Sequence, residues 1–219
     1  MNIPSKFKIT DSQLLIEFIQ QYSLGTLIVN NDSGLDANHI PFLVQTIKDQ
    51  NGNLTIKLEG HVAHNNSLVG NSQDNQSVLV VFHGPNGYIS PNFYPSKLAT
   101  GKAVPTWNYS AVHVKGTIRF IHDQQWLLNH IQQLSDFHEA HSQTQPWSVN
   151  DAPKDYIKKM LQAVVGIEIT ASEMVGNFKH SQNKSDTDYA GVIEGLRNSP
   201  SDNDRLLQQS MTETKGTSD

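Results

Sequence analysis

Apolar residues near the start of the chain recur at the spacing of a helix. In the segment "TDSQLLIEFIQQYSLG", Leu14, Leu15, Phe18 and Ile19 would share one face, while a Thr-Asp pair can cap the first turn and a glycine ends the pattern. We therefore predict a helix over 10–24.

From residue 25 to about residue 121, the helical spacing gives way to short apolar runs with the length and alternation typical of strands. Turn-forming stretches such as "NDSG" and "DQNGN" separate these runs. The predicted strands are "GTLIVNN", "ANHIPFLVQTIK", "NLTIKLEGHVAH", "SVLVVFHG", "GYISPNFY" and "AVHVKGTIRFI". Strands at this spacing favour an antiparallel barrel or a sandwich.

The rest of the chain mixes helices and strands. Helical spacing returns in "DQQWLLNHIQQLSDFHEAH" and "APKDYIKKMLQAV", which predicts helices within 123–163 that pack outside the barrel. We predict two more strands within 164–178, joined at Ser172 and Glu173, and two short helices within 187–211. Small polar residues at 212–219 predict a disordered tail, so we expect a single domain over 1–211.

Composition restricts the chemistry and the partners. The chain has 219 residues and no cysteine, which excludes disulfides, thiolate metal sites and a cysteine nucleophile, and fits a reducing compartment. A net charge of -5 without a Lys/Arg cluster gives no general attraction to nucleic acid. Because the start lacks a leader-like apolar segment and no apolar run reaches about 18 residues, we expect a cytoplasmic protein with no membrane contact.

Motifs that would announce a familiar enzyme are missing from the sequence. It contains no dinucleotide-binding, phosphate-loop, serine-hydrolase or zinc-protease motif. The cluster "HEAH" at 138–141 would place two histidines on neighbouring helix faces, but a solvated helix end explains it better. We therefore assign no metal site and no catalytic residue.

Four polar and aromatic segments are candidates for a binding site: "LEGHVAHNN" (58–66), "GPNGYISPNFY" (84–94), "VPTWNY" (104–109) and "FKHSQN" (178–183). Each also has a purely structural explanation, respectively a polar hairpin rim, aromatic packing, a core tryptophan and an ordinary polar loop. The first could present donors to an anion, and the last could bind a phosphate or ribityl hydroxyls.

The order of these segments, together with "NIPSKF" at the start and "HIPF" at 39–42, resembles the PaiB family over residues 1–211. PaiB proteins are described as FMN-binding negative transcriptional regulators. The resemblance implies a mainly β fold, the FMN-binding split β-barrel with peripheral helices, similar to pyridoxamine-phosphate oxidase. It further implies a homodimer with FMN in the cleft between the two subunits.

The resemblance also implies where the cofactor lies. "HIPF" would run beside the isoalloxazine, "AHNN" would hold the phosphate, and the strand 107–116 would line the ring edge or the dimer interface. "KHSQN" would close the site, on the same or the partner subunit. The implied cofactor-binding residues are His39, Pro41, Phe42, His61, Ala63, His64, Asn65, Tyr88, Ser90, Tyr94, Thr106, Trp107, Asn108, Tyr109, His113, Lys179, Ser181, Gln182 and Asn183.

A flavin would explain the dense "TWNY" run, because it offers a plane for stacking and an edge for hydrogen bonds. Trp107 and Tyr109 would supply area, and Thr106 and Asn108 would supply hydrogen bonds. Alternation along a strand turns these two sets to opposite faces, so both reach one ring only if the strand is irregular, which Pro105 would permit.

The chain departs from the family pattern at the phosphate turn. Where relatives tend to read Ala-Arg-Ala-Asn, it reads "AHNN", so His64 replaces a permanently charged guanidinium by an imidazole. Losing one charge-assisted contact of about 1.5–3 kcal/mol would weaken FMN binding by about 10- to 150-fold. His180 stands where an apolar residue is usual, and Phe93 replaces a tryptophan.

Three functions remain open on these residues. The first is a regulatory flavoprotein, for which DNA is suggested only by the family description because the sequence has no DNA-binding motif. The second is an FMN-dependent oxidoreductase, with His39, His61 and His113 as candidates for proton transfer. The third is a split-barrel protein that binds or degrades haem.

Overall fold

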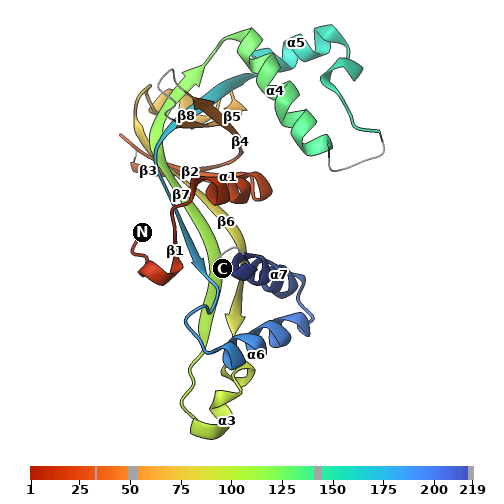
Figure 1. Cartoon of the computed structure of the whole chain (residues 1–219). Helices are drawn as coiled ribbons and strands as arrows, with labels where there is room; N and C mark the ends of the chain where they lie inside the picture. Colours follow the sequence, from red (N-terminus) through yellow and green to blue (C-terminus); the bar gives the residue numbers. More distant parts are fainter. Residues whose placement is uncertain (33, 49–53, 141–144, 217–219) are drawn as a thin grey trace. The chain divides into compact units, whose positions relative to one another are not determined.

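The computed structural model describes residues 1–32, 34–48, 54–140 and 145–216. Contacts within the chain divide it into two compact units. Unit 1 comprises Met1–Phe18, His83–His113 and Val175–Asp219, and unit 2 comprises Ile19–Phe82 and Val114–Met174. Three long strands contribute residues to both units (Figure 1).

The described strands form one eight-stranded sheet in the order β3-β2-β6-β7-β8-β5-β4, with β1 paired to β8. The strands are β1 (Lys8–Ile9), β2 (Leu24–Asn31), β3 (Gly34–Pro41), β4 (Leu43–Lys48), β5 (Leu54–Ala63), β6 (Ser77–Ile89), β7 (Thr106–Ile121) and β8 (Val164–Lys179). The pairings of β2 with β3 and β6, of β5 with β4 and β8, and of β1 with β8 are antiparallel.

Helices fill the connections between these strands. The α-helices are α1 (Ser12–Gln21), α2 (Ser67–Asn71), α3 (Ser96–Thr100), α4 (Gln124–Glu139), α5 (Lys154–Gln162), α6 (Asp186–Arg197) and α7 (Asp202–Gly216). Three short 3-10 turns are η1 (Ser5–Phe7), η2 (Pro91–Phe93) and η3 (Val149–Asp151). None of the helices that the structure describes combines the length and the apolar character needed to cross a membrane.

The sheet of unit 2 curls back on itself. β3 and β4 stand at opposite ends of the strand order, yet only Phe42 separates them in the chain. The Phe42 side chain is 1% exposed and meets the Phe82 ring edge-on at 6.0 Å. A Cβ atom on Gly25 would lie 2.8 Å from the Phe82 ring, so a glycine is needed beside this aromatic pair. Phe42 thus connects the two ends of the strand order, with its side chain buried in the barrel core.

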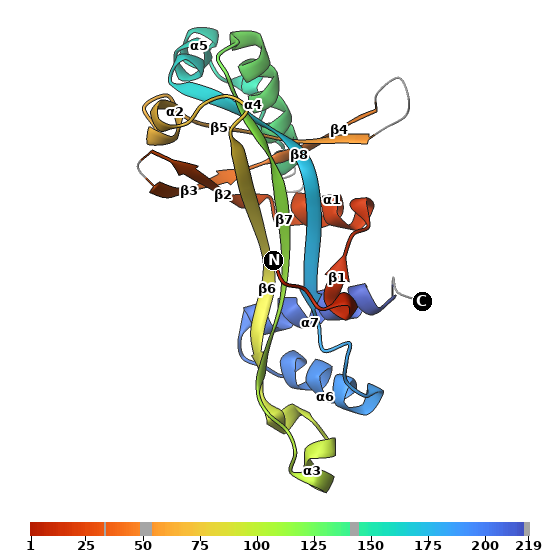
Figure 2. The same ribbon diagram turned by 90° about the vertical axis from the view of Figure 1, so that its left-hand side faces the viewer.

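Unit 1 has its own apolar core between the strands and the last two helices. α6 and α7 lie side by side (Figure 1 and Figure 2). The buried core residues are Ile89, Tyr94, Tyr189, Val192, Ile193, Leu196, Leu207 and Met211. Phe93 of η2 packs against α6 at Gly195, where a Cβ atom would lie 2.3 Å from the Phe93 ring.

Several predicted boundaries differ from the structure. β6 runs unbroken through Pro85, and β8 runs unbroken through Ser172 and Glu173, where a turn was predicted. The middle of β8 is exposed, so polar residues cost nothing there; Ser172 also donates to the Lys115 carbonyl of β7. α7 continues to Gly216, beyond residue 212 where the tail was predicted to start, and 217–219 lie outside the described residues.

Candidate functional site

The residues implied by the family resemblance fall in both units. Unit 2 holds those of β3 and of the segment that ends β5, namely His39, Pro41, Phe42, His61, Ala63, His64 and Asn65. Unit 1 holds the rest, from Tyr88 to His113 and from Lys179 to Asn183. Each group has its own geometry.

The turn that follows β5 in unit 2 is held by its backbone and by one asparagine. The His64 amide donates to the Ala163 carbonyl at 2.8 Å. Asn66 caps α2 by accepting from the Leu68 amide at 2.8 Å, and its Nδ2 donates to Asn38 Oδ1 at 3.0 Å. The side chains of His64 and its neighbours Ala63 and Asn65 remain exposed, so the turn presents an imidazole and an amide to an incoming ligand.

β3 presents His39 but buries its neighbour. The His39 side chain is exposed, and its Nδ1 lies 3.1 Å from Thr26 Oγ1. Pro41 is half-buried, and the Phe42 ring is committed to the core described above. The "HIPF" segment therefore offers a ligand the His39 ring, but not the Phe42 ring.

His61 pairs with a histidine from another element of unit 2. Its Nδ1 lies 3.2 Å from His130 Nε2 of α4, and the His130 ring stacks on Trp126 with centroids 5.1 Å apart. Burial lowers the pKa of His61, and burial together with the charge of His61 lowers the pKa of His130 to about 4. Both rings are therefore neutral at pH 7. The N–H group of one ring donates a hydrogen bond to the unprotonated nitrogen of the other.

His130 was not among the site residues predicted from the sequence, yet it is the partner of His61. A cavity of about 270 Å³ opens between this ring and the Gln45, Ile47 and Glu59 side chains. Burial, followed by the charge of Glu168, raises the pKa of Glu59. The available signal was the spacing of Trp126 and His130, which places them one turn apart on one helix face.

The first residues of β7 in unit 1 alternate regularly between exposed and buried. Trp107 is 51% exposed, its indole Nε1 donates to Asn86 Oδ1 at 3.0 Å, and its ring meets Tyr88 edge-on at 6.3 Å. Asn108 is fully buried and donates to Ser181 Oγ at 2.8 Å. Trp107 is therefore not a core residue, and the irregular strand that would let both side chains meet one ring does not occur.

A buried polar cluster joins β7 to the end of β8 in unit 1. Ser110 Oγ lies 2.6 Å from His180 Nε2, and burial lowers the pKa of His180 to about 4. His180 Nδ1 and Asn108 Oδ1 are buried without a hydrogen-bond partner among the described residues. Such groups carry a desolvation cost that a bound ligand or water can offset.

The "KHSQN" segment forms a turn fixed by its own side chains. Gln182 Oε1 accepts from the His180 amide at 2.7 Å, and Gln182 Nε2 donates to the Phe178 carbonyl at 2.6 Å. Ser181 has a φ of 60°, in the left-handed region. Lys179 Nζ donates to Thr106 Oγ1 at 2.6 Å, and burial, followed by the charge of Lys184, lowers the pKa of Lys179.

The remaining implied residues of unit 1 differ in exposure. Ser90 caps η2 by accepting from the Asn92 amide, and Tyr94 is 3% exposed within the core. The Tyr109 hydroxyl accepts from Asn177 Nδ2 at 2.8 Å, and His113 is half-buried. Asn183 is exposed. Asn108, Ser181 and Tyr94 therefore serve the interior of this unit, whereas Tyr88 and Trp107 form an exposed aromatic pair.

Known proteins resemble this chain in sequence and in fold. Residues 1–173 match the family described as "Putative FMN-binding domain". A protein of Emericella nidulans is 35% identical over 215 residues, covering 84% of this chain and 86% of its own. Protease synthase and sporulation protein PAI 2 of Bacillus subtilis is 31% identical over 211 residues, covering 96% of each chain.

Among solved structures, the FAD and haem binding protein from Mycobacterium smegmatis superposes with a TM-score of 0.57 at 13% identity, covering 84% of this chain and 79% of its own. At that identity the likeness concerns the fold alone, and it confirms the predicted split barrel with peripheral helices. The sequence matches also confirm the PaiB resemblance. The chain belongs to the "Putative FMN-binding domain" family.

Proposed function

We propose that this protein is a PaiB-type flavoprotein, a homodimer that binds FMN at the subunit interface and acts as a negative regulator of transcription. The observation that carries the proposal is the family match over residues 1–173, which includes nearly all of unit 2. The Bacillus subtilis relative, similar along almost the whole chain, supports the PaiB type.

The exposed side chains of unit 2 fit the phosphate of FMN. The turn after β5 offers His64 and Asn65, and its backbone is fixed by the Ala163 carbonyl and by Asn66. His39 stands exposed on β3 as a further donor. Imidazole and amide donors without a carboxylate in the turn suit a phosphate group.

The exposed aromatic pair of unit 1 fits a flat ring or a protein surface. Tyr88 and Trp107 each leave about half of their surface exposed, at 50% and 51%, and the indole N–H is already satisfied by Asn86. Exposed aromatic residues of this kind are enriched at interfaces. We assign this pair to the isoalloxazine or to the dimer interface, as the family resemblance implies.

When bound, the isoalloxazine would supply hydride or single-electron transfer. In unit 2, His64 and Asn65 would bind its phosphate. The buried histidines His130 and His180 are neutral at pH 7 and can donate one hydrogen bond each without adding charge.

The net charge of -5 favours regulation through a ligand or a protein partner over direct contact with DNA.

A titration of the purified protein with FMN, followed by flavin fluorescence, tests this function. Riboflavin and haemin are titrated in parallel, the second because the Mycobacterium smegmatis neighbour binds haem. Saturable binding of one FMN per subunit, tighter than riboflavin, is expected. Equal affinity for FMN and riboflavin would contradict the phosphate assignment, and selective binding of haemin would replace the flavin proposal.

A further inference from the structure

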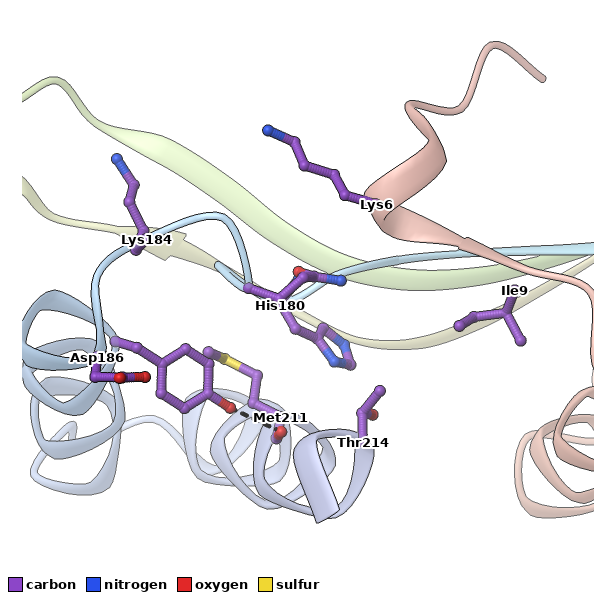
Figure 3. A pocket seen from close by; sticks show the side chains of 9 residues that line it. Lys6, Ile9, His180, Lys184, Asp186, Met211 and Thr214 are labelled. Atoms are coloured by element: carbon purple, nitrogen blue, oxygen red, sulfur yellow. Dashed lines mark hydrogen bonds between the residues drawn. The ribbon is translucent and has the colours of Figure 1, made fainter. Parts of the chain in front are cut away.

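Unit 1 contains a cavity of about 350 Å³ that the proposed function does not use (Figure 3). Its walls come from η1 and β1 at the start of the chain, from the turn after β8, and from α6 and α7. Most of its lining residues follow residue 173, where the match to the flavin family ends. Cavities of this size hold small organic ligands.

The inner wall of the cavity is largely apolar. Tyr189 and Met211 are buried, and the Tyr189 hydroxyl donates to the Met211 carbonyl at 2.8 Å, which joins α6 to α7. Ile9 is half-buried on the opposite element, β1. Because the Tyr189 hydroxyl is already satisfied, its ring offers a ligand apolar contact area, whereas Met211 is fully buried and its sulfur accepts from Asn108 Nδ2 at 3.7 Å.

The rim carries an excess of positive charge. Lys6 and Lys184 are exposed and line the cavity, and in Figure 3 both extend from the side opposite Met211 and Thr214. Lys184 Nζ lies 4.5 Å from the Tyr94 ring centroid, and these two side chains also line a neighbouring hollow beside Asp188. The carboxylate of Asp186 belongs to the first turn of α6, where the helix N-terminus offsets its charge.

His180 adds a polar group to this wall. Its ring is 2% exposed, and Nε2 is taken by Ser110, whereas Nδ1 has no partner among the described residues. Figure 3 shows the ring directed toward Met211 and Thr214. An apolar wall, a lysine pair at the rim and an unpartnered buried nitrogen together describe a binding site for an amphipathic molecule.

We propose that this cavity binds a small apolar monoanion, such as an aryl carboxylate or sulfonate, at a site separate from the flavin. The aryl group lies against Ile9 and Tyr189, and the anionic group lies between Lys6 and Lys184.

The test uses 8-anilinonaphthalene-1-sulfonate and its neutral analogue N-phenyl-1-naphthylamine, whose fluorescence rises on apolar binding. Wild type is compared with Lys6→Gln/Lys184→Gln and with Lys154→Gln/Lys158→Gln, which removes the same charge from exposed positions of α5. Thr214→Trp narrows the cavity from α7. FMN is titrated separately into each variant.

We expect Lys6→Gln/Lys184→Gln to weaken sulfonate binding by about tenfold or more, because two charged contacts are lost, and to change the neutral analogue by less than about twofold. Lys154→Gln/Lys158→Gln should bind both as wild type does, and Thr214→Trp should weaken both. If the two double lysine variants lose affinity for the sulfonate to the same extent, the proposed site is refuted.

The flavin titration separates this inference from the proposed function. Gln182, which the family resemblance assigns to the flavin, also lines the cavity. If Lys6→Gln/Lys184→Gln loses FMN together with the sulfonate, the cavity belongs to the flavin site and the separate site is refuted. If the sulfonate binds as expected and no variant binds FMN, the anion site stands and the flavin proposal fails.

Discussion

Histidines in this protein divide into exposed and buried ones with different chemistry. His64 faces solvent on a turn whose backbone is already fixed, so its side chain is available to a ligand. His130 and His180 are 2% exposed and held neutral by burial, so they act as hydrogen-bonding groups at neutral pH. We therefore predict that His64 affects ligand binding, whereas His180 affects the stability of the fold.

His64→Arg should tighten FMN binding by about tenfold or more, because a guanidinium binds phosphate through two charged hydrogen bonds at every working pH. Flavin fluorescence titrations of wild type and variant measure the two affinities. His122→Arg adds the same charge at another exposed histidine of unit 2 and should leave the affinity unchanged.

His180 should make the protein less stable in mild acid. Its pKa is about 4 when folded and returns to the ordinary value near 6.5 when unfolded, so the unfolded chain binds more protons between these values. Stability from this group is complete above about pH 6.5, falls as pH drops toward 4 and is constant below that. Between pH 7 and pH 5 the loss amounts to about 2 kcal/mol.

Urea denaturation at the two pH values measures that loss. His180→Leu/Ser110→Ala removes the titrating ring together with its hydroxyl partner, so the drop in the free energy of unfolding should shrink by about 2 kcal/mol. His83→Leu, at an exposed position of unit 1, should keep the wild-type drop. A drop unchanged in the double variant would mean that His180 is protonated when folded.

At the scale of elements, two glycines of α6 allow η2 to pack closely against this helix. A Cβ atom on Gly191 would lie 2.1 Å from the Phe93 carbonyl oxygen, and one on Gly195 would enter the Phe93 ring. The Gly191 contact is with backbone, which cannot rotate away. The position where the family reads tryptophan is therefore coupled to the packing of α6.

Gly191→Ala should lower the free energy of unfolding by about 2–4 kcal/mol, because the clash exceeds the gain in helix propensity. Gly70→Ala in α2 is the matched control: nothing lies within 4 Å of its Cβ position, so it should raise stability by up to about 1 kcal/mol. Urea denaturation measures the free energy of unfolding of both variants. Stabilisation by both substitutions would disprove the close approach of α6 to Phe93.

Hydrophobic patterning predicted most elements, and it failed where local signals conflicted with pairing. "PN" in β6 and "SE" in β8 are turn residues, yet both strands continue because neighbouring strands supply the pairing. Conversely, the predicted strand "ANHIPFLVQTIK" breaks at Phe42, directly after Pro41, a residue that interrupts central strands. Binding segments were visible as polar runs, but burial decided which of their side chains face outward, and burial depends on the whole fold.

At the scale of the whole molecule, Trp107→Ala should weaken both dimerisation and FMN binding, because the exposed aromatic pair is assigned to the subunit interface or the ring. We expect the dimer dissociation constant to rise by about tenfold or more in sedimentation equilibrium. Trp147→Ala, at a residue that is 43% exposed in unit 2, is the control and should keep wild-type association. A flavin-competent dimer in Trp107→Ala would assign Trp107 a structural role only.

The pairing of β5 with β8 has a consequence for the synthesis of this protein. Lys57 and Glu168 of these strands form an ion pair across 111 residues of chain. While the ribosome is still translating that interval, β5 can pair with β4 but its other edge is open. Neighbouring nascent chains on one message present the same open edge to each other, so slower initiation of translation should raise the yield of correctly folded protein.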